Sequence, residues 1–307
     1  MLLPEEALIE IAKFQETTIL YGADDKYKDI QFGKGKRNYD KICTKLKNIN
    51  PELVDYSTCQ TISLEELKEY MLKYLPEIYG SNYQKRVQEL NGMLYPHKMS
   101  TPFDAAIEQN YQNDNYETNA IHINRKPLSI QILSTAHEYV HDFLTPYTTT
   151  RFNSVISSYH YDELLSILTE YIILSKIKNN FQEDLTLLHE MTRIKANHDH
   201  VEEVEATYEL ERQGAVLHEM IEYFDYARHN AYKYIISDIY ATKLAECYQL
   251  DTVTFLKELR KVIQGLSSID NLLNYYNVSL KEPSVIYPYL DKIDRVGPVL
   301  AKKDKNK

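Results

Sequence analysis

The chain has 307 residues, of which 43% are hydrophobic and 26% are charged, a composition typical of a folded globular protein with a sizeable core. Its formal net charge of −10 argues against nucleic acid or an anionic membrane surface as a main partner. No apolar run of about 18 residues occurs, so no membrane span is expected. The three cysteines lack CxxC spacing, which favours reduced thiols and a cytoplasmic location over a disulfide framework or a thiolate metal site.

Helical signals dominate the N-terminal third of the chain. Ser63 and Glu66 form a capping-box pattern at the start of LEELKEYMLKYL, whose apolar residues recur at helical spacing: Leu64, Leu67, Met71 and Leu75. The chain holds only 8 Gly and 10 Pro, which leaves little room for a hairpin-rich β fold. We therefore expect residues 1–92 to form a helical N-terminal part.

The helical periodicity is lost between about residues 92 and 124. In AIHIN, Ile121 and Ile123 alternate with His122 and Asn124, and this period of two predicts a strand with one buried face. The polar stretch QNYQNDNYETN (109–119), which precedes AIHIN, is expected to be a loop. A small β-sheet is therefore expected in this region.

Long helical patterns occupy the rest of the chain. Pro127 is expected in the first turn of a helix that continues through LSIQILSTAHEYVHDFL. Further helices are expected at about 159–180, 182–196, 200–229, 230–248, 251–265 and 284–294. The basic tail 301–307 is expected to be disordered. The sequence thus predicts a mostly α fold of packed helices with a small β-sheet, in which residues 93–300 form the functional domain.

The stretch TAHEYVHDFL (135–144) predicts a metal site. His137 and His141 are four residues apart, so on a helix their imidazoles lie on one face and can bind the same Zn²⁺ ion. Glu138 is rotated by about 100° from His137 and lies beside the metal position. There it can accept a proton from an attacking water. We therefore predict one zinc ion with a glutamate general base.

The next helical pattern supplies a third ligand, because a catalytic zinc commonly has three protein ligands and one open position. In YHYDELLSILTEYIIL, the polar residues Glu163, Ser166 and Glu170 share one face of an otherwise apolar helix. Glu163 is the predicted ligand. Either Glu170 or Asp162 is expected to orient a ligand histidine from behind.

Other candidate clusters are weaker. Asn197-His198-Asp199-His200 has a metal-binding composition, but it is expected to precede a helix with Asp199 as the N-cap. His122, His160 and His189 are isolated in the sequence and are expected to be structural or exposed. The chain contains no GxSxG, Walker or GxGxxG motif, so nucleophilic-serine, nucleotide and dinucleotide chemistry have no support.

Three segments resemble the core of the thimet oligopeptidase / oligoendopeptidase F family of zinc metallopeptidases: NAIHIN, STAHEYVHDF and ELLSILTE. In that family a strand, an HExxH helix and a second helix with an ExxSxxxE pattern build the site. The resemblance implies a zincin-like catalytic core with the sheet beside the HExxH helix. It also implies that His137, His141 and Glu163 bind the metal and that Glu138 is the general base.

The segment AYKYIISDIYA (231–241) resembles the tyrosine-rich segment of the same family. This implies that Tyr234 hydrogen-bonds the tetrahedral intermediate and that Tyr232 is its neighbour in the site. His229 is the nearest counterpart of a family histidine that precedes the tyrosines. A neutral phenol, with an unperturbed pKa of about 10, is a suitable proton donor at pH 7. The chain departs from the family at Val140, where Gly is usual, and members of the family have a larger N-terminal helical lobe.

The expected activity is hydrolysis of peptide bonds in oligopeptides or unstructured segments, with a peptide as the expected partner. AIHIN is expected to offer a free edge to an extended peptide. Two alternatives remain open. One is a zinc-stabilised module that binds peptides or a partner without hydrolysis, and the other is a protease that matures one dedicated peptide.

Overall fold

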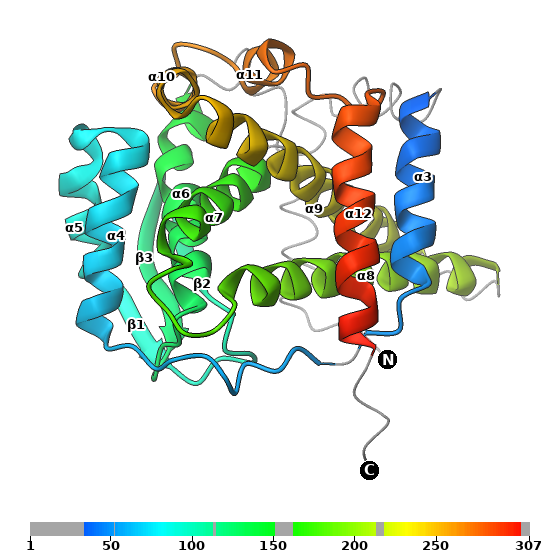
Figure 1. The fold of residues 1–307 in the computed structure, drawn as a ribbon, viewed down its shortest axis with the longest axis horizontal. Helices are drawn as coiled ribbons and strands as arrows, with labels where there is room; N and C mark the ends of the chain where they lie inside the picture. Colours follow the sequence, from blue (N-terminus) through cyan, green and yellow to red (C-terminus); the bar gives the residue numbers. More distant parts are fainter. Residues whose placement is uncertain (1–33, 52, 113–114, 151–161, 213–217, 302–307) are drawn as a thin grey trace.

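The structure is a computed structural model that describes residues 34–51, 53–112, 115–150, 162–212 and 218–301. Most of these residues lie in helices, and three strands form one small sheet (Figure 1). The expected fold class, mostly α with a small sheet beside the HEYVH helix, is confirmed. The start of the predicted N-terminal part (1–33), His160 and nearly all of the predicted tail (301–307) lie outside the described residues.

Helix α4 (Leu64–Tyr79) begins where the capping box predicts. The backbone N–H of Glu66 donates to Ser63 Oγ at 3.1 Å, and the N–H of Ser63 donates to the Glu66 carboxylate at 2.6 Å. This pairing satisfies two backbone donors at the helix end. The apolar stripe of α4 is buried at Leu67, Met71 and Leu75. Helix α5 (Gln84–Asn91) follows after one 3₁₀ turn, and α3 (Lys34–Lys47) packs against the C-terminal half of the molecule.

The sheet has the strand order β1-β3-β2, formed by Leu94–His97, Asn115–Asn124 and Ala106–Gln112 in that order. The central strand β3 is parallel to β1 and antiparallel to β2. Ile121 and Ile123 of β3 are fully buried, as their alternation predicts. Helix α6 (Gln131–Thr150) packs on β3, so the strand supports the HEYVH helix directly.

Two expectations about the sheet region are wrong. In the polar stretch expected to be a loop, residues 109–112 form the end of β2 and residues 115–119 the start of β3, while 113–114 lie outside the described residues. The antiparallel ladder satisfies backbone groups whatever the side chains are, and Gln109 Nε2 also donates to Thr118 Oγ1 at 3.2 Å. AIHIN has no free edge, because β1 and β2 flank it on both sides. The edge strand that reaches the HEYVH helix is β2, through the backbone of Ile107.

The HEYVH helix begins later than Pro127 predicts. The Pro127 carbonyl accepts a hydrogen bond from the Ile62 N–H at 2.9 Å, and the Ser129 N–H donates to the Gln60 carbonyl at 2.8 Å. These bonds hold the chain extended beside the N-terminal part, so α6 starts only at Gln131. Helix α7 (Asp162–Ile177) then packs between α6 and α9.

Two long helices replace three predicted ones in the next region. Helix α8 (Leu185–Arg212) runs through the break expected between 196 and 200, and helix α9 (His218–Leu250) runs through the break expected at 229–230. Asp199 lies in the middle of α8, so it is not an N-cap. Residues 213–217, between α8 and α9, lie outside the described residues. Helices α10 (Thr252–Ile263), α11 (Ile269–Tyr275) and α12 (Pro283–Leu300) complete the described chain.

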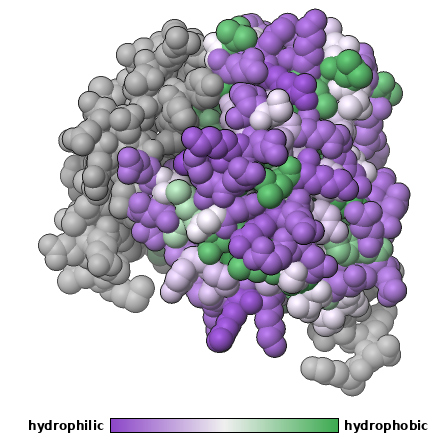
Figure 2. All heavy atoms as spheres, turned by 90° about the vertical axis from the view of Figure 1, so that its left-hand side faces the viewer, coloured by the Kyte–Doolittle hydropathy of each residue, from purple (hydrophilic) through white to green (hydrophobic). Residues whose placement is uncertain are grey.

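The arrangement places α6 and α7 between two groups of elements. Figure 1 shows α4, α5 and the sheet on one side and α8, α9, α12 and α3 on the other. Figure 2 shows the side on which α4 and α5 lie, where hydrophilic side chains cover most of the surface and hydrophobic ones are scattered. No described helix combines the length and hydrophobicity that crossing a membrane requires.

Candidate metal centre

Three side chains from α6 and α7 converge on one point. His137 Nε2 lies 3.2 Å from Glu163 Oε2, and His141 Nε2 lies 3.7 Å from Glu163 Oε1. The centroids of the two imidazole rings are 4.8 Å apart, as expected for residues one helical turn apart. Glu163 reaches them from the first turn of α7, which packs beside α6. Among the described residues, these three form the one His/Cys/Asp/Glu group whose donor atoms could hold a metal, with all donor atoms within 4.8 Å of one another.

The donor set and its spacing fit a zinc ion. Donor atoms at about 2.0–2.1 Å from one tetrahedral Zn²⁺ lie roughly 3.3–3.5 Å from each other. The separations of 3.2 and 3.7 Å between the imidazole nitrogens and the Glu163 oxygens bracket this range. Two imidazoles and one carboxylate also form a common ligand set of catalytic zinc, which leaves one position open.

The electrostatics of the group favour a cation. Burial lowers the pKa of His137, but the carboxylates of Glu163 and Glu170 outweigh burial and raise this pKa to about 10. Burial lowers the pKa of His141 to about 4, so this imidazole is neutral and can act as a ligand. The site therefore stabilises one positive charge between two carboxylates, and a bound metal ion can supply that charge in place of a proton.

Glu170 orients the His137 ring through Nδ1, the nitrogen that does not face Glu163. Its Oε1 lies 2.5 Å from His137 Nδ1, which directs Nε2 of the same ring toward Glu163. An imidazole held through Nδ1–H by a carboxylate is typical of metal-binding histidines. The sequence left Glu170 and Asp162 as candidates for this contact; Glu170 makes it, and the side chain of Asp162 lies outside the described residues.

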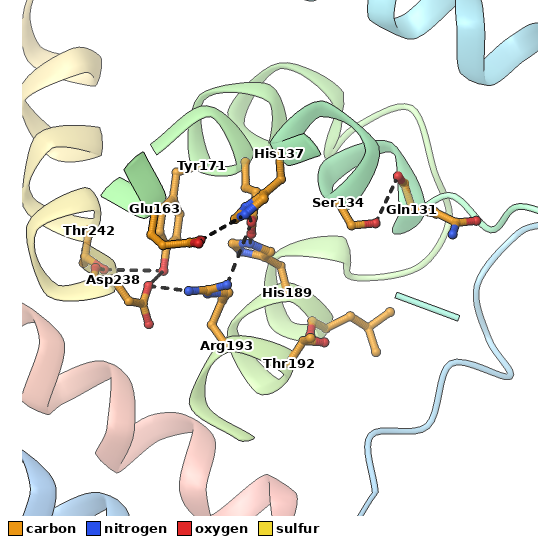
Figure 3. Close-up of polar contacts among 12 residues, drawn as sticks. Gln131, Ser134, His137, Glu163, Tyr171, His189, Thr192, Arg193, Asp238 and Thr242 are labelled. Atoms are coloured by element: carbon orange, nitrogen blue, oxygen red, sulfur yellow. Dashed lines mark hydrogen bonds and ion pairs between the residues drawn. The ribbon is translucent and has the colours of Figure 1, made fainter. Parts of the chain in front are cut away.

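His189 of α8 supports Glu170 from the other side, although the sequence analysis assigned it no role at the site. His189 is fully buried, and its Nε2 lies 2.6 Å from Glu170 Oε2. Figure 3 shows His189 and Glu163 approaching His137 from different helices. The spacing of polar residues at 189, 193 and 197, four apart along an otherwise partly apolar helix, is the sequence signal that marks this buried polar face.

Glu138 lies between the three-residue group and the edge of the sheet. The backbone N–H of Ile107 in β2 donates to Glu138 Oε2 at 3.1 Å. Burial chiefly, together with the negative charge of Glu163, raises the pKa of Glu138 to about 7, against the opposing effect of His137. A carboxylate with a pKa near neutrality is well matched to accepting and returning a proton at physiological pH.

Lys233 of α9 is a second site residue that the sequence analysis missed. Its Nζ lies 3.1 Å from Glu163 Oε1, and its side chain is buried. Burial raises the pKa of Glu163, but Lys233, His141 and His137 outweigh burial and hold that pKa well below its usual range. The sequence signal was a single lysine in the otherwise uncharged start of AYKYIISDIYA.

The two tyrosines of α9 lie in different surroundings. The ring of Tyr234 stacks on His200 of α8 at 4.7 Å, and Lys233 Nζ lies 5.3 Å from the Tyr234 ring centroid. Tyr232 instead stacks on Tyr39 of α3 at 4.7 Å. Residues two apart on a helix point in nearly opposite directions, which separates the two rings. The side chain of His229 lies outside the described residues.

The comparisons with known proteins show likeness in structure only. No protein-family model and no curated protein matches the chain. The fold is similar to the crystal structure of a "putative oligoendopeptidase F" from Bacillus anthracis str. Ames, with a TM-score of 0.54, 16% sequence identity, and coverage of 88% of this chain and 56% of that one.

A second solved structure, a "putative peptidase" from Chlamydophila abortus, has a TM-score of 0.48 and 11% identity over 98% of this chain and 56% of that one. The chain therefore spans little more than half the length of either protein. The likeness to the Bacillus anthracis structure shows that the two proteins share a mostly helical fold.

Proposed function

We propose that this protein is a zinc-dependent peptidase of the thimet oligopeptidase / oligoendopeptidase F type, in which His137, His141 and Glu163 hold one zinc ion. The observation that carries the proposal is the place of Glu138, beside the three-residue group and against the edge strand β2. The fold shared with the Bacillus anthracis protein supports it. A structural metal site would give Glu138 no task.

A zinc ion bound by these residues would supply Lewis-acid activation of a water and of the scissile carbonyl. Glu138 takes a proton from the attacking water and returns it to the leaving amine. The Ile107 N–H donates a hydrogen bond to one carboxylate oxygen of Glu138. This bond fixes the orientation of the carboxylate, and with it the direction of its other oxygen. Glu170 keeps the His137 ring in the orientation that presents Nε2.

The substrate is an extended peptide that pairs with β2. Strand β2 lies at the edge of the sheet, and the Ile107 N–H is directed at Glu138 instead of β3. A peptide added along this edge passes directly over the proposed general base. Extended backbone with free N–H and C=O groups is available in oligopeptides and unstructured segments, whereas folded domains pair most of these groups internally, which defines the substrate class.

Tyr234 is the proposed hydrogen-bond donor to the developing oxyanion. It follows Lys233 on α9, and Lys233 contacts the proposed ligand Glu163. A phenol supplies a proton without adding a charge to the resting site. Tyr232, which faces α3, is proposed to support the helix that carries Tyr234.

The proposal is tested by metal analysis and by cleavage of a mixed peptide library followed by mass spectrometry. Wild type should contain one zinc per chain and cleave unstructured peptides. Glu138→Gln should retain zinc and fold but lose about 10²–10⁴-fold in kcat, because only the proton transfer is removed. Glu65→Gln, an exposed glutamate on α4, is the matched control and should remain active.

Zinc-loaded wild type that cleaves no peptide would contradict the proposal and favour a peptide-binding module. Glu138→Gln with wild-type kcat would remove the general base from the mechanism.

A further inference from the structure

A chain of buried charged residues extends from the candidate metal centre to the last helix. Its members are Glu170 of α7, Arg193 of α8, Asp238 of α9 and Lys292 of α12. None of the four is more than 6% exposed. Two carboxylates and two cations alternate along this chain, so its net charge is zero. Buried charges are costly unless they are paired, which gives each member a strong need for its neighbours.

The first member, Glu170, contacts two histidines and Arg193. One oxygen of Glu170 meets His137 Nδ1 at 2.5 Å, and the other meets His189 Nε2 at 2.6 Å. Arg193 Nη1 lies 3.9 Å from the oxygen that holds His137. The position of this oxygen decides where Nδ1 can point, and thus where Nε2 of the same ring points.

Arg193 lies between two carboxylates. Its nearest nitrogens are 3.9 Å from Glu170 Oε1 and 3.9 Å from Asp238 Oδ1, which are ion-pair distances and not hydrogen bonds. Figure 3 shows the guanidinium between His189 and Asp238. If either carboxylate were removed, the buried guanidinium would keep only one of its two negative neighbours. Arg193 therefore attracts both carboxylates.

Asp238, the next member after Arg193, is held by partners from several helices. Tyr171 Oη donates to Asp238 Oδ1 at 2.7 Å, and Asn197 Nδ2 and Tyr289 Oη donate to Oδ2 at 2.7 and 2.9 Å. Lys292 Nζ lies 3.2 Å from Oδ1. These partners come from α7, α8 and α12, so the carboxylate of Asp238 has little freedom to move.

We propose that Arg193 is a positioning residue of the metal centre, which joins Glu170 to the anchored Asp238 and thereby fixes the orientation of His137. This inference rests on the proposed metal binding at His137. It assigns the buried ion chain a role in the site in addition to its contribution to folding. The loss of zinc affinity on substitution should decrease along this row of charged residues, because Arg193 contacts Glu170 directly whereas Asp238 acts through Arg193.

The experiment compares Arg193→Met, which removes the charge at similar length, with Arg193→Lys, which keeps the charge. Arg295→Met is the matched control, because Arg295 pairs with Glu190 across α12 and α8 at 2.7 Å without reaching Glu170. Zinc affinity is measured by competition with a chelator, and the electronic spectrum of the cobalt-substituted protein reports the ligand geometry. Thermal unfolding of the metal-free proteins measures stability separately.

Arg193→Met is expected to weaken zinc binding by about 10-fold, at the lower end of the 10–100-fold usual for a residue that contacts the ligand itself, and to shift the cobalt spectrum. Arg193→Lys should restore most of the affinity, and Arg295→Met should match wild type. A folded Arg193→Met protein with wild-type zinc affinity and an unchanged cobalt spectrum would overturn the inference, whatever its loss of stability.

If Arg193→Met does not fold, Asp238→Asn decides the question, because it keeps the side-chain volume and removes the anchoring charge. A severalfold weaker zinc affinity supports the inference, and an unchanged affinity overturns it. The proposed function fails separately. It fails if zinc-bound wild type cleaves no peptide, a result that leaves the affinity comparison valid, whereas a wild type that binds no zinc contradicts both proposals.

Discussion

The two helix pairs around the candidate site contribute in different ways. Helices α6 and α7 carry the three donor residues and the proposed general base. In the part of the chain that the structure describes, α8 and α9 contribute no donor to this group. They contribute His189, Arg193 and Lys233, which contact the two glutamates of α7.

Helices α6 and α7 therefore determine what the site can bind, whereas α8 and α9 determine how the charges of the site are compensated. Glu163 and Glu170 are the same residue type on one face of one helix, yet their partners differ. Glu163 meets Lys233 and both motif histidines, whereas Glu170 meets His189 and Arg193 behind His137. The two carboxylates acquire separate roles only through the helices that pack against α7.

The largest expected effect tests the donor pair α6 and α7. His141→Ala and Glu163→Ala should each lower zinc affinity by more than about 100-fold, because the remaining two ligands hold a tetrahedral ion poorly. Glu170→Gln should cost less, about 10–100-fold, because it acts through His137. Chelator competition measures all three. Tight zinc binding by Glu163→Ala, together with loss of zinc from Glu170→Gln, would reverse the roles of the two glutamates.

The next effect concerns the supporting pair, through Lys233. Lys233→Met should destabilise the metal-free protein by about 3–5 kcal/mol, the usual cost of removing one partner of a buried ion pair. The zinc-bound protein should lose less, because a metal ion compensates the charge of Glu163. Thermal and urea unfolding with and without zinc measure this difference.

Lys243→Met is the matched control on α9, because Lys243 pairs with Glu246 near the surface and should contribute less than about 1 kcal/mol. Equal destabilisation of the metal-free and zinc-bound forms of Lys233→Met would show that the lysine acts in packing alone.

Tyr234 and Tyr232 test whether the two sides of α9 differ in function. Tyr234→Phe should lower kcat by about 10²–10³-fold at unchanged zinc content, the usual cost of losing one oxyanion donor. Tyr232→Phe should change kcat much less, because its ring faces Tyr39 of α3. Steady-state kinetics on one cleaved peptide measure both variants.

A Tyr234→Phe change confined to KM would indicate uniform substrate binding. No change in kcat or KM would place Tyr234 outside the site.

The smallest effect lies outside both helix pairs. Ser63→Ala removes the cap of α4 and should lower the free energy of unfolding by about 1 kcal/mol, with zinc affinity and kcat unchanged. Urea unfolding measures the stability change. A marked loss of zinc affinity in this variant would show that the N-terminal helices also influence the metal centre.

Local patterns predicted much of the fold and the candidate site. The capping box at Ser63, the alternation in AIHIN and the helical spacing of His137 and His141 each depend on residues that are neighbours in the chain. The strand residues 109–112 and 115–119 escaped prediction because these polar residues show no apolar alternation, while backbone pairing between β2 and β3 supports both strands. The helix break expected between 196 and 200 was wrong because capping residues inside a long helix resemble a helix start.

The sequence by itself determined the chemistry that α6 and α7 can present, because helix geometry brings residues four and seven apart onto one face. Only the tertiary structure decided which oxygens and nitrogens meet. Lys233 contacts Glu163 over a sequence separation that no periodicity covers, and Arg193 lies between Glu170 and Asp238 only because three helices pack together. The physical reason is that buried charges are stable only beside their partners, and those partners are brought together by packing between helices.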